Sequence, residues 1–195
     1  MTRLSVNLNK IALIRNSRGA NYPDLLKVAQ DCERFGAQGI TVHPRPDERH
    51  CKFSDLQPLK ELCTTEFNIE GYPDEHFMQK VLAVQPHQCT LVPDAPNQLT
   101  SDHGWDTLHH FAFLQDKIAR LKDAGIRVSL FIDPNDALIE KAAEAGADRI
   151  EFYTGPYAHH YPKNPEEAVS ALRASCHTAI RCGLGINAGH DLNLE

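Results

Sequence analysis

The chain has 195 residues, of which 42% are hydrophobic and 24% are charged, and its formal net charge is −6. This composition is ordinary for a globular domain and excludes a disordered or fibrous chain. A net negative charge argues against non-specific binding of nucleic acid or of acidic membranes, since both need a basic surface. An anionic ligand would therefore have to be bound by a local cluster of cationic side chains.

Hydropathy predicts neither a secretory leader nor a membrane span. The first residues lack the apolar stretch of a signal peptide, and no run approaches the roughly 18 apolar residues of a membrane helix. We therefore expect a cytoplasmic protein. Six cysteines occur without a CxxC pair, and several fall at apolar positions of predicted helices. This pattern favours reduced, buried thiols over a disulfide framework or a zinc site.

One unit recurs along the chain, namely an amphipathic helix, a glycine after it, and a short apolar strand. The spacing of apolar residues predicts helices before Gly36, Gly125, Gly146 and Gly183, and glycine is the residue expected to end a helix in the left-handed conformation. Seven strands are predicted, over residues 4–9, 39–43, 66–70, 88–92, 128–132, 149–153 and 184–187. Their mostly apolar interiors indicate a parallel sheet that is buried on both faces.

Seven such units favour an α/β fold of the TIM (β/α)₈ type over an open doubly wound sheet, because no GxGxxG nucleotide-binding turn follows the first strand. A typical chain of this fold has about 250 residues, whereas this one stops shortly after the seventh predicted strand. We expect a single barrel domain over residues 1–195 that is truncated at its C-terminus and lacks the eighth strand. An open barrel would otherwise leave two sheet edges exposed.

The segment 40–50 combines an apolar strand with a dense group of reactive side chains at its end. His43 and Arg45 each precede a proline, so a stiff, extended backbone presents both of them. In a barrel of this type the site is built from strand ends and the loops that follow them. We interpret Asp47, Glu48 and Arg49 as loop scaffold and ion-pair partners.

Glu70 and His190 stand at the ends of two other predicted strands. Helix capping commonly explains an asparagine or aspartate at such a junction, as we expect for Asp133, but it explains neither a glutamate nor a histidine. Imidazole and a tuned carboxylate both titrate near neutral pH. His43, Glu70 and His190 are therefore the candidate acid–base groups.

A further cationic cluster is predicted on the first loop, in the segment Arg15-Asn16-Ser17-Arg18-Gly19. Together with Arg45, Arg49 and His50 it would form a phosphate site, because the planar guanidinium matches phosphate oxygens in a bidentate manner. Solvated surface positions suit Arg15 and Arg49 more readily than Arg18 and Arg45. The glycine after Arg18 would let the loop turn sharply over a ligand.

Collinear motifs from Val6 to His190 resemble the pyridoxine 5′-phosphate synthase family. This resemblance implies a TIM barrel with extra helices that condenses 3-amino-2-oxopropyl phosphate with 1-deoxy-D-xylulose 5-phosphate, giving pyridoxine 5′-phosphate, inorganic phosphate and water. It implies no metal and no organic cofactor, and it suggests a homo-octamer. The motifs that carry it are VNLNKIA, RNSRG, GITVHPR, DERH, FNIE, LVP, VSLFID and NAGH, which begin at residues 6, 15, 39, 47, 67, 91, 128 and 187.

The resemblance also implies roles for individual positions. His43 and Glu70 match the family's general bases and His190 its general acid. The positions that match contacts to deoxyxylulose phosphate are Arg45, His50 and Thr100, and those that match contacts to the amino ketone phosphate are Asn7 and Arg18. Repeated proton transfers at adjacent carbons would require several such groups around one pocket.

Three substrate-binding positions depart from the familiar pattern of the family. Asn9 and Lys10 stand where that pattern has aspartate and histidine, and Asp191 stands where it has glycine. Lys10 can still hold a phosphate or a hydroxyl group, whereas Asp191 places a carboxylate near a phosphate loop. The phosphate-binding loop after the family's eighth strand has no counterpart in these residues.

Three alternative functions make different demands on the sequence. A phosphosugar aldolase or isomerase on the same barrel would need a lysine at a strand end or a metal cluster, and Lys10 is the only candidate lysine. A metal-dependent hydrolase would need paired metal-ligating histidines, a spacing that the sequence around His43 lacks. A non-catalytic subunit that binds phosphorylated metabolites is favoured by the missing eighth strand.

Overall fold

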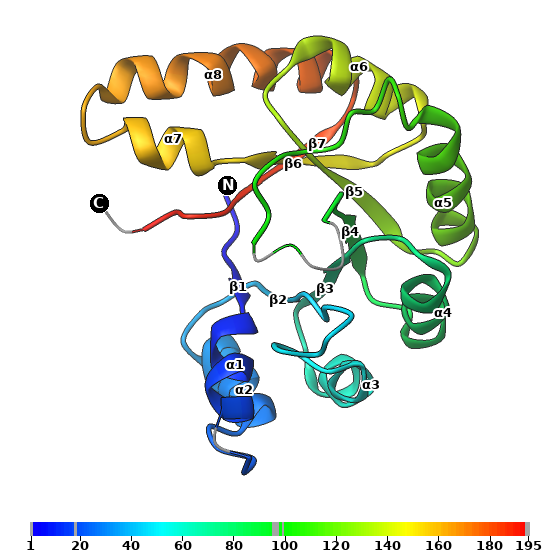
Figure 1. Ribbon diagram of the computed structural model, residues 1–195, viewed down its shortest axis with the longest axis vertical. Helices are drawn as coiled ribbons and strands as arrows, with labels where there is room; N and C mark the ends of the chain where they lie inside the picture. The colour runs from blue at the N-terminus through cyan, green and yellow to red at the C-terminus, as the bar shows by residue number, and fades with distance from the viewer. Residues whose placement is uncertain (1, 18, 95–97, 99, 194–195) are drawn as a thin grey trace. The chain divides into compact units, whose positions relative to one another are not determined.

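The computed structural model describes residues 2–17, 19–94, 98 and 100–193 (Figure 1). Its strands follow one another in a single sheet in the order of the sequence. They alternate with helices, which is the TIM-type α/β arrangement that the sequence predicts, with seven strands in the described part of the chain. The strands are β1 (Ser5–Asn7), β2 (Gly39–Val42), β3 (Glu66–Gly71), β4 (Gln88–Leu91), β5 (Arg127–Ile132), β6 (Arg149–Tyr153) and β7 (Gly185–Gly189).

The helices lie between these strands, and two helices follow each other after β1 and after β6. None of the described helices is both long enough and apolar enough to span a membrane. The helices are α1 (Asn9–Ser17), α2 (Leu25–Arg34), α3 (Phe53–Leu62), α4 (Glu75–Val84), α5 (Phe111–Asp123), α6 (Asp136–Glu144), α7 (Gly155–His160) and α8 (Pro165–Arg181).

The described residues form two compact units that divide within β4. In the N-terminal unit, which reaches residue 89, β1, β2 and β3 pair in parallel, with Val6 opposite Ile40 and Ile40 opposite Phe67. In the C-terminal unit β5, β6 and β7 pair in parallel, and α8 packs against α6 and α7. The prediction of a single domain over residues 1–195 stays a prediction.

Burial along the strands follows their place in the sheet. Every residue of β2 and β4 is buried, as is the stretch from Val128 to Ile132 in β5. Strands that are covered on both faces read as continuous apolar runs, which is why they were recognisable in the sequence. The outermost strands, β1 and β7, are more exposed.

Helix ends follow local chemistry. The side chains of Asp24, Asp74, Asn135 and Asn164 accept hydrogen bonds from the first backbone N–H groups of α2, α4, α6 and α8. The predicted glycine stops are confirmed, since Gly36, Gly125, Gly146 and Gly183 all have positive φ. All six cysteines are free thiols, as expected, although only Cys51 and Cys89 are fully buried.

The first loop was wrongly predicted. β1 ends at Asn7 and α1 begins at Asn9, so Arg15 and Asn16 lie on a helix and not on a loop. The Asn7 side chain accepts a hydrogen bond from the Asn9 backbone at 2.9 Å, which starts the helix where the strand had been expected to continue. Leu8, Ala12 and Arg15, at helical spacing, are all buried.

Arg15 also corrects a prediction about exposure. Its guanidinium is buried and forms a bidentate ion pair with Asp55 of α3, with both N–O distances at 2.8 Å. The Asp55 side chain raises the pKa of Arg15 through this hydrogen bond, which outweighs the opposing effect of burial. A buried guanidinium needs such a partner, so Arg15 ties α1 to α3 and does not extend a phosphate site.

Asp133 is not the helix cap that we had expected. Its carboxylate accepts a hydrogen bond from the Gly104 backbone at 3.0 Å, and the cap of α6 is Asn135. Pro134 lies between Asp133 and Asn135 and disfavours a helical backbone at Asp133, so α6 begins only after the proline.

Substituting Asp55→Asn should lower the free energy of unfolding by about 3–5 kcal/mol, because it leaves the Arg15 guanidinium buried without a counter-ion. Urea denaturation followed by circular dichroism measures this loss. Glu144→Gln is the control, since Glu144 pairs with Lys141 on an exposed helix surface and its loss should cost less than about 1 kcal/mol. Equal small losses in the two variants would contradict the role assigned to the buried pair.

Candidate active site

The loop between β2 and α3, residues 43–52, presents the cationic and imidazole groups predicted at this strand end. His43 and Arg45 are only 6% and 5% exposed, although both lie outside regular structure. The backbone N–H of His43 donates to Oδ1 of Asn9 at 2.9 Å. Asn9 of α1 thus fixes the start of the loop through its side-chain oxygen. The side-chain N–H groups of Asn9 take no part in this contact.

His43 is held in its neutral form. Burial lowers the pKa of its imidazole to about 3, with further lowering from the positive charges of Arg45, His50 and Arg49. A neutral imidazole has a free lone pair at neutral pH, which a general base requires. The cations that flank it make this base weak in the absence of an anion.

Several cationic side chains lie around His50. Burial lowers the pKa of this half-buried residue, and the charges of Arg49, Arg45 and Lys10 lower it further, opposed by Asp47. Nδ1 of His50 is buried and has no hydrogen-bond partner among the residues that the structure describes. An enclosed donor or acceptor that lacks a partner, among several cationic groups, is suited to an anionic ligand.

Glu70 lies on β3 among amide side chains. Asn7 donates to its Oε2 at 3.4 Å and Asn68 to its Oε1 at 3.5 Å, both of them long contacts. The negative charge of Glu70 also raises the pKa of the Cys89 thiol, to which burial contributes more. The carboxylate is partly exposed, as a group that exchanges protons with a ligand should be.

The C-terminal unit contains a second group, around His190, which follows β7. Nε2 of His190 lies 3.0 Å from Oγ1 of Thr100, and Nδ1 lies 2.9 Å from Oδ2 of Asp191. The Tyr153 ring meets the imidazole edge to face, with 5.2 Å between centroids. Nε2 and one ring face are therefore in contact with neighbours, whereas Nδ1 lies close to a carboxylate oxygen without forming a hydrogen bond with a described residue.

The backbone explains why a glycine would suit position 191. Asp191 has φ +57 and His190 has φ +89, values that side-chain-bearing residues seldom adopt. Aspartate is one of the residues that tolerate this region best. The departure from the family pattern at 191 is thus compatible with the turn, and the carboxylate itself approaches His190.

Glu151 on β6 belongs to the polar residues expected at the strand ends, but the sequence assigned it no catalytic or binding role. Burial raises the pKa of its carboxyl group to about 7. Its Oε1 lies beside Gly189 of β7. A Cβ atom at position 189 would lie only 2.7 Å from this oxygen. A charged residue between the buried Ile150 and Phe152 was the signal in the sequence that could have identified it.

The structure thus groups most of the predicted residues by unit. Asn7, Asn9, Lys10, His43, Arg45, His50 and Glu70 belong to the N-terminal unit, and Thr100, His190 and Asp191 to the C-terminal unit. Arg18 lies outside the described residues. Arg49 pairs with Asp47 at 3.1 Å and the Glu48 carboxylate accepts from the Phe53 backbone at 2.9 Å, which confirms their interpretation as loop scaffold.

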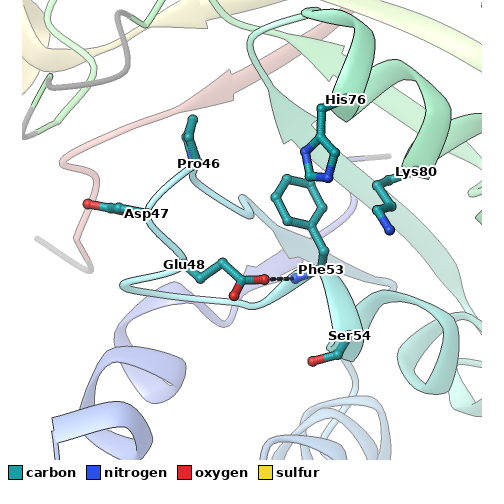
Figure 2. A pocket seen from close by; sticks show the side chains of 7 residues that line it. All are labelled: Pro46, Asp47, Glu48, Phe53, Ser54, His76 and Lys80. Carbon is teal, nitrogen blue, oxygen red and sulfur yellow. Dashed lines mark hydrogen bonds between the residues drawn. The ribbon is translucent and has the colours of Figure 1, made fainter.

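An open pocket of about 520 Å³ lies beside this loop but contains none of the predicted site residues (Figure 2). The Phe53 and His76 rings meet edge to face within it, 4.6 Å apart. It is lined by Pro46, Asp47, Glu48, Phe53, Ser54, His76 and Lys80. We do not assign the chemistry to it, because the buried imidazole and the buried guanidinium of the loop are not among its lining residues.

Comparison with known proteins gives consistent matches. The family model for the pyridoxal phosphate biosynthesis protein PdxJ matches residues 4–195. A curated relative from Cytophaga hutchinsonii, named pyridoxine 5′-phosphate synthase, is 59% identical over 194 residues, which cover 100% of this chain and 82% of the relative. A relative of the same name from Phocaeicola vulgatus is 57% identical with the same coverage.

A solved structure of deoxyribose phosphate aldolase from Aeropyrum pernix matches with a TM-score of 0.62 and 15% sequence identity. The match covers 95% of this chain and 74% of the aldolase. At this level of identity the likeness shows the fold alone.

The imidazole of His43 should remain uncharged as the pH is lowered from 8 to 5 in the free protein. NMR titration of its ring signals, assigned by their loss in His43→Gln, measures this. An inflection near the ordinary value of about 6.5 would contradict the environment described.

The same pKa has a consequence for stability. Because the folded pKa lies below the unfolded one, the unfolded chain binds the proton first, so acidification from about pH 6.5 towards 3 destabilises the fold. This one group contributes a slope of at most about 1.4 kcal/mol per pH unit. Urea denaturation at several pH values should show a shallower dependence in His43→Gln than in the parent chain.

Proposed function

The chain belongs to the PdxJ family of pyridoxine 5′-phosphate synthases, enzymes of vitamin B6 biosynthesis, and on this premise we propose how its residues carry the reaction. The proposed reaction condenses 3-amino-2-oxopropyl phosphate with 1-deoxy-D-xylulose 5-phosphate to give pyridoxine 5′-phosphate, phosphate and water. The observation that supports it most is the neutral imidazole of His43 on the same loop as Arg45 and His50.

Arg45 and His50, with Thr100, bind the phosphate-bearing chain of deoxyxylulose phosphate in this proposal. Lys10 adds positive charge at the same place, since its charge acts on His50. Asn9 contributes the donors of its amide group, because its oxygen is already engaged by the His43 backbone. These cations form the local cluster that a chain of net negative charge needs in order to bind an anion.

Asn7, Arg18 and Asp191 bind the amino ketone phosphate. The amide of Asn7 lies next to Glu70, so a substrate held by Asn7 would be within reach of that carboxylate. Asp191 is an acceptor and would meet the substrate's ammonium group more favourably than its phosphate. This assignment gives a use to the carboxylate that stands in place of the family's glycine.

His43 and Glu70 take protons from the substrate carbons and nitrogen, and His190 returns a proton to the leaving oxygen. Joining an amine to a ketone and closing an aromatic ring require several such transfers in sequence. The bound phosphate opposes the charges of Arg45 and His50, which are among the causes of the low pKa of His43. Substrate binding therefore strengthens the base that the reaction needs.

Two further properties are proposed from the family resemblance. The chain acts in the cytoplasm, where phosphorylated metabolites are retained, and it assembles as a homo-octamer. Size-exclusion chromatography with light scattering measures the second property directly.

Incubating the chain with both substrates should release pyridoxine 5′-phosphate and inorganic phosphate in equal amounts, as measured by mass spectrometry and a phosphate assay. Each substrate alone is the control and should give neither product. Binding of deoxyxylulose phosphate without any product would instead support a non-catalytic subunit.

The variant Glu70→Gln removes a proton acceptor and keeps the shape of the side chain. We expect kcat to fall by about 10²–10⁴-fold, with the dissociation constant of deoxyxylulose phosphate changed by less than about twofold. Glu61→Gln, on the exposed side of α3, is the matched control and should leave both values unchanged. An equal loss of binding would show that Glu70 holds a ligand or supports the fold.

A further inference from the structure

The side chain of Asn16, near the end of α1, contacts three consecutive carbonyl groups of the loop 43–52. Its Nδ2 lies 3.1 Å from the carbonyl oxygen of Glu48, 3.0 Å from that of Arg49 and 2.7 Å from that of His50. An amide has two N–H groups for these acceptors, so at least one of the bonds is shared. Asn16 is partly buried and belongs to none of the groups assigned to substrate.

Neighbouring residues fix the orientation of this amide. The Arg15 Nε–H donates to Oδ1 of Asn16 at 3.1 Å, and a guanidinium can only donate. The amide oxygen must therefore face Arg15, and the NH₂ group must face the loop. Arg15 is in turn fixed by both oxygens of Asp55.

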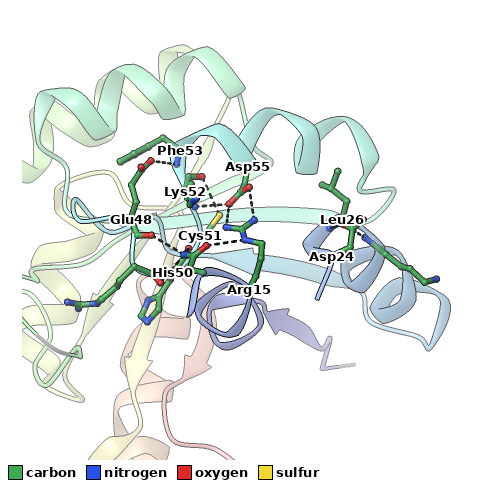
Figure 3. Close-up of polar contacts among 12 residues, drawn as sticks. Arg15, Asp24, Leu26, Glu48, His50, Cys51, Lys52, Phe53 and Asp55 are labelled. Carbon is green, nitrogen blue, oxygen red and sulfur yellow. Dashed lines mark hydrogen bonds and ion pairs between the residues drawn. The ribbon is translucent and has the colours of Figure 1, made fainter. Parts of the chain in front are cut away.

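Asp55 also binds the end of the same loop. Its Oδ2 accepts a hydrogen bond from the Lys52 backbone at 2.7 Å, at the start of α3 (Figure 3). Figure 3 shows the Asp55 carboxylate facing the Arg15 guanidinium, to the right of Glu48, His50 and Cys51. The chain from Arg15 through Asn16 and Asp55 therefore holds the loop at two places.

The loop needs this support, because its own backbone does not satisfy the carbonyl groups through regular structure. Glu48 has a left-handed backbone with φ +52, and its carbonyl and the next two face Asn16 of α1. At the far end of the turn, the buried Nδ1 of His50 has no partner among the described residues. Asn16 thus fixes the main chain of a residue whose side chain is available to a ligand.

We infer that Asn16 is a positioning residue for the binding of deoxyxylulose phosphate, acting through the backbone of residues 48–50. It touches no substrate and sets the place from which His50 meets the phosphate. This inference rests on the proposed function, because that function assigns His50 to this substrate.

The test is Asn16→Asp, which keeps the size of the side chain and the oxygen that faces Arg15. It replaces the NH₂ group with an oxygen that faces three carbonyl oxygens, so the loop loses its support. We expect the KM and the dissociation constant for deoxyxylulose phosphate to rise by about tenfold or more, the loss of one to two hydrogen bonds. The KM for the amino ketone phosphate and kcat should change by less than about twofold.

Asn135→Asp is the matched control. The side-chain oxygen of Asn135 accepts from the Ala137 and Leu138 backbones, and aspartate can accept the same two bonds. All kinetic constants should stay at the values of the parent chain. Asn16→Ser retains one hydrogen-bond donor and should give a smaller rise in the KM and the dissociation constant for deoxyxylulose phosphate. It replaces Asn16→Asp as the test variant if that variant does not fold.

Equal rises in both KM values, or a fall in kcat alone, in a folded Asn16 variant would overturn the inference. The dissociation constant, measured by calorimetry with deoxyxylulose phosphate, separates it from the proposed function. If the parent chain binds this compound but forms no product, the proposed function fails, and the Asn16 variants still test the positioning role.

Discussion

The ion pair between Arg15 and Asp55 is the interaction on which the site of the N-terminal unit depends. A buried guanidinium is tolerated only with a well-placed counter-ion, so the pair fixes α1 and α3 in one arrangement. Asn16 then takes its orientation from Arg15, and the Lys52 backbone takes its place from Asp55. Both connections lead to the same loop, so its geometry follows from an interaction that lies outside it.

That loop combines two functions that conflict electrostatically. Cationic groups suited to a phosphate stand next to His43, and together with burial they lower the pKa of the imidazole to about 3. An imidazole with such a low pKa is a weak base. A bound phosphate would oppose the neighbouring positive charges and so raise this pKa. In the C-terminal unit Glu151 shows the opposite shift, because burial raises the pKa of a carboxyl group and keeps it protonated up to about 7.

The sequence predicted the features that depend on local pattern. Buried strands read as apolar runs, and glycine ends four helices because each requires a positive φ. The motif around His43 and Arg45 identified the loop that carries the buried imidazole and guanidinium of the candidate site. Long-range pairing was not visible, since nothing near Arg15 in the sequence reveals that Asp55 lies 2.8 Å from it. The same limit explains Glu151, whose pKa depends on the protein that surrounds it and not on its neighbours in the chain.

The central claim is that the substrate's phosphate, held by Arg45 and His50, makes His43 a stronger base. The most direct measurement is the pKa of His43 by NMR titration in the presence and absence of saturating deoxyxylulose phosphate. The account predicts an upward shift of about one to three units on binding, the effect of an opposite charge placed nearby. A pKa that stays unchanged while the binding sites are saturated would contradict it.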